Sequence, residues 1–353
     1  MIMTIHRSDT CEAHEELKVL KLSSKFHIHQ VLGKGAFATV FLAQHRRKNL
    51  LHTEKSNKRE IALKIINLHK IAARRRPRQL GDDDRNGITM SEMEEDDTEE
   101  LFFPSRLEKR ALDKNVCDDL EMTTVKNMIQ MEINVHSYAS KLRHPNIVSL
   151  LESFHYSLPG KNHLVAAMAI EYCPLGDLHF YLKRKRDKMK NRCGSEEIES
   201  NRHTLLEENE AKYAMRHILR GLAFLHSHGI AHRDIKPGNI LLKRRDGVKK
   251  KFDNGNFSLA ECTLKIGDFG LAVKMSDEDD WDETHDTLCG TPSCLAPEIA
   301  RCTPKRPRQS PNITSGNQMD NQVKKYGQPA DLWSTGCLLF GEYRCSESKF
   351  ENG

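Results

Sequence analysis

The chain contains 353 residues, of which 38% are hydrophobic and 30% are charged. This length allows one large domain or two modest ones, because single domains mostly run to roughly 100–200 residues, and the high charge predicts polar insertions outside the core. With 55 basic against 50 acidic side chains the net charge is only +5, which argues against a general nucleic-acid binder with an unopposed basic face.

Neither membrane insertion nor export is indicated by the sequence. The longest apolar run, at 164–170, is far shorter than the roughly 18 residues of a membrane span. The N-terminus mixes acidic and basic side chains and fits neither a secretory nor a transit signal. The cysteines include no CxxC pair, so neither a disulfide scaffold nor a zinc ribbon is predicted. We therefore expect a cytoplasmic protein with no membrane span.

Patterned segments alternate with charged inserts along the first half of the chain. After an N-terminal extension at 1–25, residues 26–68 are rich in strand-forming residues and end in a β-branched run. Blocks of like charge follow and predict a disordered insert at about 70–123. The pattern resumes with a helical segment at 125–142 and continues to about Leu182.

The second half contains one strong helix between polar inserts. Apolar residues recur at i, i+3, i+4 and i+7 spacing from Ala211 to Leu225, the period of an amphipathic helix. Polar inserts are predicted at about 183–207, 243–261 and 303–325. Charged runs of this kind are usually solvated turns, and the alternative is that they dock acidic regulatory partners.

A glycine-rich segment lies between two apolar pairs in the strand-rich region. Residues 33–40 read GKGAFATV, and glycines there permit a tight turn and let backbone N–H groups approach phosphate oxygens. Taken alone, the pattern also fits a hairpin that binds no ligand.

A lysine interrupts the apolar strand that follows, which reads IALK at 61–64. Because lysine is rarely buried without a partner, Lys64 implies that a phosphate and a carboxylate lie nearby. Glu132 in the helical segment is a candidate for that carboxylate, although most helix glutamates are simply solvated.

Three short motifs follow in a fixed order in the second half of the chain. Residues 232–239 read HRDIKPGN, residues 268–270 read DFG and residues 296–298 read APE. With the glycine segment and the strand lysine, they match the motif set of protein kinases. From 26 to 340 the chain therefore resembles the eukaryotic protein kinase superfamily.

The resemblance implies an α+β, bilobal protein kinase fold. The small β-rich N-lobe would cover 26–171, with the charged insert inside it, and the helical C-lobe would cover 172–340. An atypical polar tail at 341–353 stands where further C-lobe helices are expected, so this lobe is predicted to be incomplete at its C-terminus.

The resemblance also implies transfer of the γ-phosphate of ATP to serine or threonine hydroxyls of protein substrates, with Mg²⁺ as cofactor. Asp234 would orient the hydroxyl and accept its proton, and Lys236 would counter charge on the γ-phosphate. Asn239 and Asp268 would supply oxygen ligands to Mg²⁺. The implied catalytic set is Lys64, Glu132, Asp234 and Lys236.

Nucleotide-binding roles are implied in the same way. Backbone groups of Glu171 and Cys173 would bind adenine, and Ile170 would fall at the gatekeeper position. Asp177 would meet the ribose, unless it serves only as a helix N-cap. Three side chains would sandwich the adenine ring, namely Val40, Ala62 and Leu241. The full implied set is Leu32, Gly33, Lys34, Gly35, Ala36, Phe37, Ala38, Val40, Ala62, Lys64, Ile170, Glu171, Cys173, Asp177 and Leu241.

The segment between the DFG and APE motifs contains a candidate regulatory residue. A phosphate on Thr287 would pair with Arg233 and order this loop, and the alternative is an unmodified loop threonine. The lysine at position 236 resembles serine/threonine rather than tyrosine kinases.

Within the superfamily, residues 35–40, 144–148 and 171–178 resemble the ULK-type kinases that initiate autophagy. The nearest competitor is the polo/Aurora type, because Leu271 and Thr291 depart from the residues usual in the ULK type. A third alternative, based on the early end of the chain, is a kinase-derived fragment that binds nucleotide or a partner without turnover.

Overall fold

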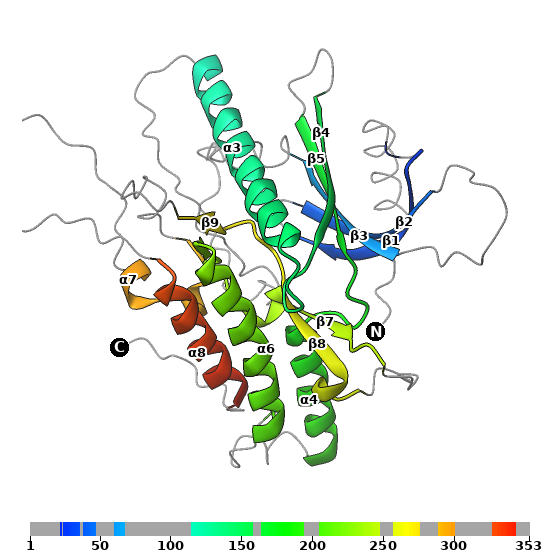
Figure 1. The fold of residues 1–353 in the computed structure, drawn as a ribbon, viewed down its shortest axis with the longest axis vertical. Helices are drawn as coiled ribbons and strands as arrows, with labels where there is room; N and C mark the ends of the chain where they lie inside the picture. Colours follow the sequence, from blue (N-terminus) through cyan, green and yellow to red (C-terminus); the bar gives the residue numbers. More distant parts are fainter. Residues whose placement is uncertain are drawn as a thin grey trace, which may run out of the picture. The chain divides into compact units, whose positions relative to one another are not determined.

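The structure is a computed structural model that describes residues 22, 24–35, 38–46, 60–67, 114–157, 164–193, 205–247, 257–275, 289–300 and 327–343. These residues divide into two compact units, with the boundary between Pro174 and Leu175. Unit 1 contains a β-sheet and one long helix, and unit 2 is mainly helical, as Figure 1 shows. The predicted α+β character is confirmed.

Unit 1 is built on a five-stranded antiparallel sheet with the spatial order β1-β2-β3-β5-β4. The prediction of a strand-rich segment at 26–68 is confirmed for the strands described there, and Ile61, Ile65 and Ile66 supply β-branched side chains that suit a pleated strand. The strands are β1 (Phe26–Lys34), β2 (Ala38–His45), β3 (Glu60–Asn67), β4 (Leu150–Ser157) and β5 (Leu164–Glu171).

One face of this sheet is closed by a buried apolar cluster. Phe41 of β2, Leu63 of β3 and Ala169 of β5 pack there with Phe26. Leu22 belongs to the same cluster and is 1% exposed, so the expected N-terminal extension at 1–25 contributes to the core. The strand pattern alone could not show this, because Leu22 precedes the first strand.

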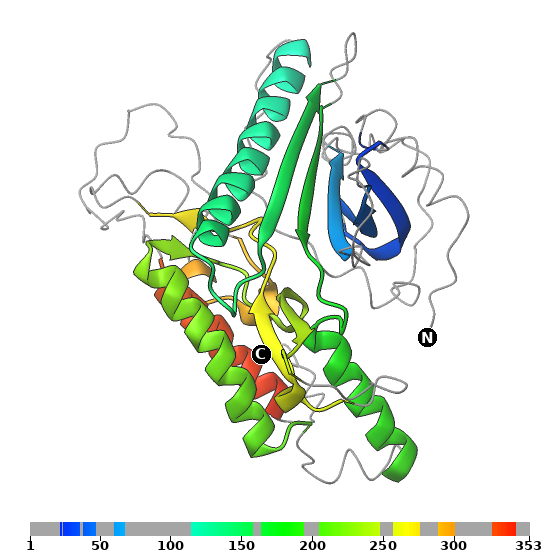
Figure 2. The same cartoon turned by 45° about the vertical axis from the view of Figure 1, so that its right-hand side comes forward.

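Helix α3 (Lys114–Lys141) packs on the opposite face of the sheet. Ile129 and Ile133 of the helix are buried against Ile66 and Met168, and Figures 1 and 2 both show α3 running beside β4 and β5. Side chains alternate along a strand, so Lys64, two residues from Ile66, lies on the face that α3 covers.

The start of α3 corrects the predicted insert at 70–123. The helix begins at Lys114, well before the expected helical segment at 125–142. Its first turns mix acidic residues with the apolar residues Val116, Cys117 and Leu120, a weaker pattern than that of the packed half. Backbone hydrogen bonds nevertheless propagate a helix outward from its packed half. Residues 70–113 of the predicted insert lie outside the described residues.

Unit 2 combines helices with two small antiparallel sheets. The helices are α4 (Leu178–Cys193), α6 (Glu208–Ser227), α7 (Pro297–Ala300) and α8 (Pro329–Tyr343). The strand pairs are β6 (Ile230–Ala231) with β9 (Val273–Lys274), and β7 (Ile240–Arg244) with β8 (Cys262–Ile266). The short 3₁₀ helices are η1 (Pro237–Asn239), η3 (Leu259–Glu261) and η5 (Pro292–Cys294). Helices α6 and α8 lie side by side in both ribbon views (Figures 1 and 2).

Helix α6 confirms the helix predicted from the apolar spacing between 211 and 225. At its start the backbone N–H of Glu207 donates to Oε2 of Glu210 over 3.3 Å, which satisfies one donor at the helix entrance. The buried residues of α6 are Ala211, Ala214, Ile218, Gly221, Leu222 and Leu225.

The polar insert predicted at 183–207 is shorter than expected. Helix α4 continues to Cys193, because lysine and arginine are good helix formers and Lys185 bonds to Glu210 of α6. At the far end of the same range, Leu205 and Leu206 are buried.

The predicted insert at 243–261 is also shorter than expected, because both ends of this range belong to regular structure. Arg244 pairs with Cys262 in the β7–β8 ladder, whose backbone hydrogen bonds do not depend on apolar side chains. Leu259 is 0% exposed and anchors η3 in the core. The predicted insert at 303–325 lies outside the described residues.

The boundary between the units lies slightly later than the predicted division after 171. Glu171 still bonds to unit 1 through Ser149, whereas the N–H of Leu175 donates to the carbonyl of Leu242 in unit 2. The predicted tail at 341–353 begins as helix, since α8 ends at Tyr343. No helix in the described ranges is long and apolar enough to cross a membrane.

Candidate active site

Asp234 lies between β6 and η1 in unit 2, and its side chain is 6% exposed. The Thr291 hydroxyl donates to Oδ1 over 2.7 Å, and Nδ2 of Asn239 donates to Oδ2 over 2.8 Å. The ammonium group of Lys236 lies 3.5 Å from the same Oδ2. The structure therefore brings together three predicted site residues, with the carboxylate fixed in orientation and a cation beside it.

The amide of Asn239 is oriented by two contacts with Asp234. Besides the carboxylate, Nδ2 donates to the backbone carbonyl of Asp234 over 2.8 Å, so both amide hydrogens point toward that residue. The Oδ1 atom consequently faces away from Asp234, as a ligand oxygen for a cation would have to do.

Asp268 follows β8 directly and is placed next to Asn239 by the backbone. The N–H of Gly267 donates to the carbonyl of Asn239 over 2.9 Å, and the ring of His232 bonds to the carbonyl of Gly267 over 3.0 Å. Asp268 is exposed and has a φ of 57°, in the left-handed region that aspartate tolerates better than most residues. The two segments that carry the residues predicted to bind Mg²⁺ are thus joined by a backbone hydrogen bond.

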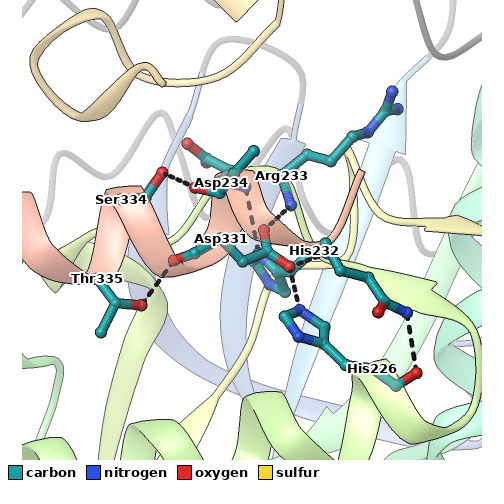
Figure 3. Close-up of polar contacts among 9 residues, drawn as sticks. His226, His232, Arg233, Asp234, Asp331, Ser334 and Thr335 are labelled. Atoms are coloured by element: carbon teal, nitrogen blue, oxygen red, sulfur yellow. Dashed lines mark hydrogen bonds and ion pairs between the residues drawn. The ribbon is translucent and has the colours of Figure 1, made fainter. Parts of the chain in front are cut away.

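A buried carboxylate from α8 holds the segment that carries Asp234 (Figure 3). Asp331 is 1% exposed, and its two oxygens accept the backbone N–H groups of His232 over 2.9 Å and Arg233 over 2.7 Å. The ring of His226 in α6 also contacts Asp331, at 2.8 Å. One side chain thereby fixes the backbone on the N-terminal side of Asp234.

Arg233 adopts a strained backbone conformation within this segment. Its φ is 66°, which costs a non-glycine residue roughly 1–2 kcal/mol, and its Nε donates to the carbonyl of Leu271 over 2.6 Å. Thr287, its predicted phosphate-bearing partner, lies outside the described residues.

The predicted lysine–carboxylate pair is present in unit 1. Nζ of Lys64 on β3 lies 2.7 Å from Oε1 of Glu132 on α3, and the two side chains are 17% and 8% exposed. Removing such a charge from water is costly unless an opposite charge is adjacent. The sequence argument that Lys64 needs a carboxylate therefore identified the correct residue type and position.

The glycine segment forms the connection between β1 and β2. Gly33 pairs with Val40, and the N–H of Gly35 donates to the carbonyl of Ala38 over 2.9 Å. A Cβ at Gly33 would meet no atom within 4 Å, and one at Gly35 would meet only the Ala38 carbonyl oxygen, at 3.6 Å. Within the described ranges, the space beside these glycines is thus left open by the chain. Two predicted loop residues, Ala36 and Phe37, lie outside the described residues.

The other residues assigned to adenine are distributed between the two units. In unit 1, Ala62 and Ile170 are directly opposed across β3 and β5, on the same face as Lys64. Cys173 is buried in the same unit. In unit 2, Leu241 is half-buried in β7.

Asp177 has the N-cap role that the sequence left as an alternative. Its Oδ1 accepts the backbone N–H of Phe180 over 2.7 Å, at the start of α4. Its backbone also forms an isolated bridge with Leu241. Contact with a ribose stays a prediction.

Two residues that hold the site had no role predicted from the sequence. Thr291 was only a subfamily marker, and Asp331 was not singled out. A carboxylate opening an otherwise apolar helix was the available signal for Asp331, because a buried charge requires partners.

Cys294 in η5 adds to the surroundings of Asp234. Burial raises the pKa of its thiol, and the negative charge of Asp234 acts in the same direction, while Lys236 opposes it. The carbonyl of Cys294 accepts the hydroxyl of Ser334 over 2.8 Å, which ties η5 to α8. This segment therefore lies within electrostatic range of the Asp234 cluster.

Comparison with known proteins agrees with this geometry. The protein kinase domain family matches residues 108–352. Serine/threonine-protein kinase PLK4 of Drosophila melanogaster is 25% identical over 315 residues, which cover 89% of this chain and 25% of that protein. Serine/threonine-protein kinase ATG1c of Arabidopsis thaliana is 32% identical over 200 residues, covering 57% of this chain and 19% of the relative.

A third relative, serine/threonine-protein kinase PLK4 of Nematostella vectensis, is 30% identical over 214 residues, covering 61% of this chain and 15% of that protein. The chain thus spans a quarter or less of the length of these curated relatives. Since the family match covers more than half of the chain and includes the Asp234 cluster, the chain belongs to the protein kinase domain family.

Proposed function

We propose that the protein transfers the γ-phosphate of ATP to serine or threonine hydroxyls of protein substrates. The observation that carries this proposal is the buried Asp234 carboxylate, oriented by Thr291 and Asn239 with Lys236 beside it. Such an arrangement favours catalysis over the alternative of a binding fragment, because mere binding gives no reason to fix a carboxylate in this way. The names of the relatives also support serine and threonine as acceptors.

In this mechanism Asp234 receives a hydrogen bond from the substrate hydroxyl and accepts its proton as the oxygen attacks the γ-phosphorus. The bond from the γ-phosphorus to the ADP oxygen breaks at the same time. The charge of Lys236 offsets negative charge on the phosphoryl group in transfer. Positioning and charge stabilisation account for most of the rate, since the protein has little covalent chemistry to perform.

The donor set of unit 2 fits Mg²⁺, which prefers carboxylate and amide oxygens. Asn239 turns its Oδ1 away from Asp234, and the neighbouring Asp268 is exposed. When bound, Mg²⁺ would neutralise charge on the ATP phosphates. The residues that would hold it are Asn239 and Asp268.

Unit 1 supplies groups suited to the phosphates and the adenine. Lys64, held by Glu132, provides a positive charge, and the space beside Gly33 accepts a phosphate without steric conflict from the chain. Ala62 and Val40 present small and β-branched apolar side chains of the kind that pack on a purine.

Replacing Gly33 by alanine should weaken ATP binding without destabilising the fold. The new Cβ meets no atom of the described residues within 4 Å. The free energy of unfolding should therefore stay within about 1 kcal/mol of the wild-type value. We expect the KM for ATP to rise several-fold, measured alongside thermal unfolding. Gly341→Ala is the matched control, because its Cβ also meets nothing within 4 Å but lies on α8. An unchanged KM in Gly33→Ala would exclude phosphate binding at this turn.

The proposed activity is tested with purified protein, Mg²⁺-ATP and a generic basic protein as acceptor. Mass spectrometry should locate new phosphate on serine or threonine, and Lys64→Met should lose most of this activity. Thermal unfolding of the variant shows whether its fold persists. Phosphate found only on tyrosine, or no transfer above a reaction without enzyme, would reject the proposal.

The finer assignment to ULK-type autophagy signalling rests on the resemblance in 35–40 and on similarity to the plant kinase ATG1c. The PLK4 relatives favour a polo-like, cell-cycle role as the second candidate. Activation by phosphate on Thr287, regulatory partners at the charged inserts and a cytoplasmic location stay predictions.

A further inference from the structure

Helix α6 carries an exposed basic surface on the opposite side from its buried stripe. Arg216 and Arg220 are exposed, and their i, i+4 spacing places them next to each other on the helix. At 100° per residue, Leu219 and His217 flank this pair on either side. Leu219 is 42% exposed, so an apolar side chain stands on the surface beside the two charges.

A third arginine is brought to the same place by the β7–β8 sheet. Nδ1 of His217 accepts the N–H of Leu264 on β8 over 3.2 Å, so this edge of α6 lies on β8. Arg245, which follows β7, donates its backbone N–H to the carbonyl of Glu261 just before β8. Its side chain is exposed as well. We call Arg216, Arg220 and Arg245, with Leu219, the arginine surface.

All three guanidinium groups lie close enough to His217 to affect its ring. Burial is the main reason why the pKa of His217 lies below its ordinary value. The positive charges of Arg220, Arg216 and Arg245 each lower that pKa further, and no carboxylate in the described ranges opposes them. All three cations therefore lie within electrostatic range of one imidazole.

None of these arginines has an ion pair among the residues that the structure describes. Two of the acids nearby are already engaged, whereas Asp246 next to Arg245 is exposed. Glu208 pairs with Lys212, and the carboxylate of Glu261 accepts the N–H of Ser258. Like charges that are held close together repel one another. An anionic partner would reduce the electrostatic repulsion among the three arginines.

We propose that the arginine surface docks a phosphorylated peptide segment of a partner protein. Guanidinium groups bind phosphate through paired N–H donors, and a cluster of arginines is a recurrent way to recognise a phosphorylated side chain. Leu219 offers contact to an apolar residue beside the phosphate. The surface is preorganised, because α6 buries its other face and η3 and β8 hold it from the side.

A protein segment fits this surface better than a bilayer or a nucleic acid. Glu207 and Glu208 are exposed at the start of the same helix, where a flat anionic membrane would meet their charge. A nucleic acid would need a basic track, whereas the basic and acidic side chains of the chain are nearly equal in number. The inference does not rest on the proposed kinase activity, since docking needs no phosphoryl transfer.

The test measures binding of a fluorescein-labelled decapeptide with a phosphoserine next to a leucine, in the absence of ATP. The serine version of this peptide and vesicles rich in phosphatidylserine serve as comparisons. We expect the phosphopeptide to bind at least about tenfold more tightly than the serine peptide, and the affinity to fall with salt. The double variant Arg216→Gln/Arg220→Gln should lose about tenfold in affinity.

The matched control is Lys183→Gln/Arg186→Gln on α4, which removes the same charge elsewhere on unit 2. It should bind like wild type, and thermal unfolding should show both double variants folded. A second readout is the ring C–H signal of His217 in NMR spectra, which should shift as phosphopeptide is added. Equal binding of the two peptides, equal loss in the control, a preference for vesicles, or an unmoved His217 signal would each overturn the proposal.

Discussion

Replacing Asp268 by asparagine should abolish phosphoryl transfer while leaving unit 2 folded. The substitution removes the only negative charge from the two proposed Mg²⁺ ligands, Asn239 and Asp268, and a hard cation such as Mg²⁺ is held mainly by carboxylate oxygens. Asparagine is suited to the backbone here, because it tolerates the φ of 57° about as well as aspartate does. Loss of activity in this variant would therefore report chemistry rather than misfolding.

The measurement is steady-state phosphorylation of a basic protein together with thermal unfolding. Asp246→Asn is the control, since Asp246 is an exposed aspartate in the turn after β7. For comparison, Asp234→Asn should lower the rate by roughly 10²–10⁴, the usual contribution of a positioned acid or base. An Asp268→Asn protein with wild-type turnover would remove Asp268 from the proposed mechanism.

Replacing Asp331 by alanine should have the largest effect on stability of any change considered. Two buried backbone N–H groups, of His232 and Arg233, would lose their acceptor, and each unpaired donor costs about 1–3 kcal/mol. A loss of about 2–6 kcal/mol is a large part of the 5–15 kcal/mol that holds a typical domain together. Activity should fall as well, because the strained Arg233 backbone next to Asp234 would be released.

Thr335→Val provides the control for this prediction. Thr335 is buried on the same helix, but its hydroxyl bonds only to the carbonyl of Asp331 one turn earlier. We expect the midpoint temperature of thermal unfolding to fall by several degrees or more in Asp331→Ala and by much less in Thr335→Val. Similar unfolding temperatures for the two variants would show that the Asp331 contacts contribute little.

The sequence predicted those helices and strands whose pattern of apolar or β-branched residues lies within one short segment. Helix α6 was predicted because its buried residues repeat with the helical period, and β3 because it is β-branched. The charged helix ends were not predicted, because acidic residues surround the few apolar ones where α3 begins at Lys114, and basic residues dominate where α4 ends at Cys193. On α4 the contact of Lys185 with Glu210 of α6 supports the helix, and a contact between segments so far apart in the chain cannot be seen in composition.

The candidate site was predictable from chemistry only where a residue type demands a partner. Lys64 implied a carboxylate because a charge is costly to bury alone, and Glu132 is that carboxylate. Nothing in the sequence tied Asp331 to His232, since a distance of 99 residues along the chain contains no pairing information. The N-cap role of Asp177 likewise needed the structure to show where α4 begins.

The contacts of Asp331 also set an order of events during synthesis. The segment at 232–234 leaves the ribosome about 100 residues before the aspartate that holds it, which at roughly 5–20 residues per second is about 5–20 s. During that interval the backbone of Arg233 has no acceptor in α8 to offset its left-handed conformation. The sheet of unit 1 is complete by Glu171 and can form earlier. The segment at 232–234 therefore reaches its final backbone conformation later than the sheet of unit 1.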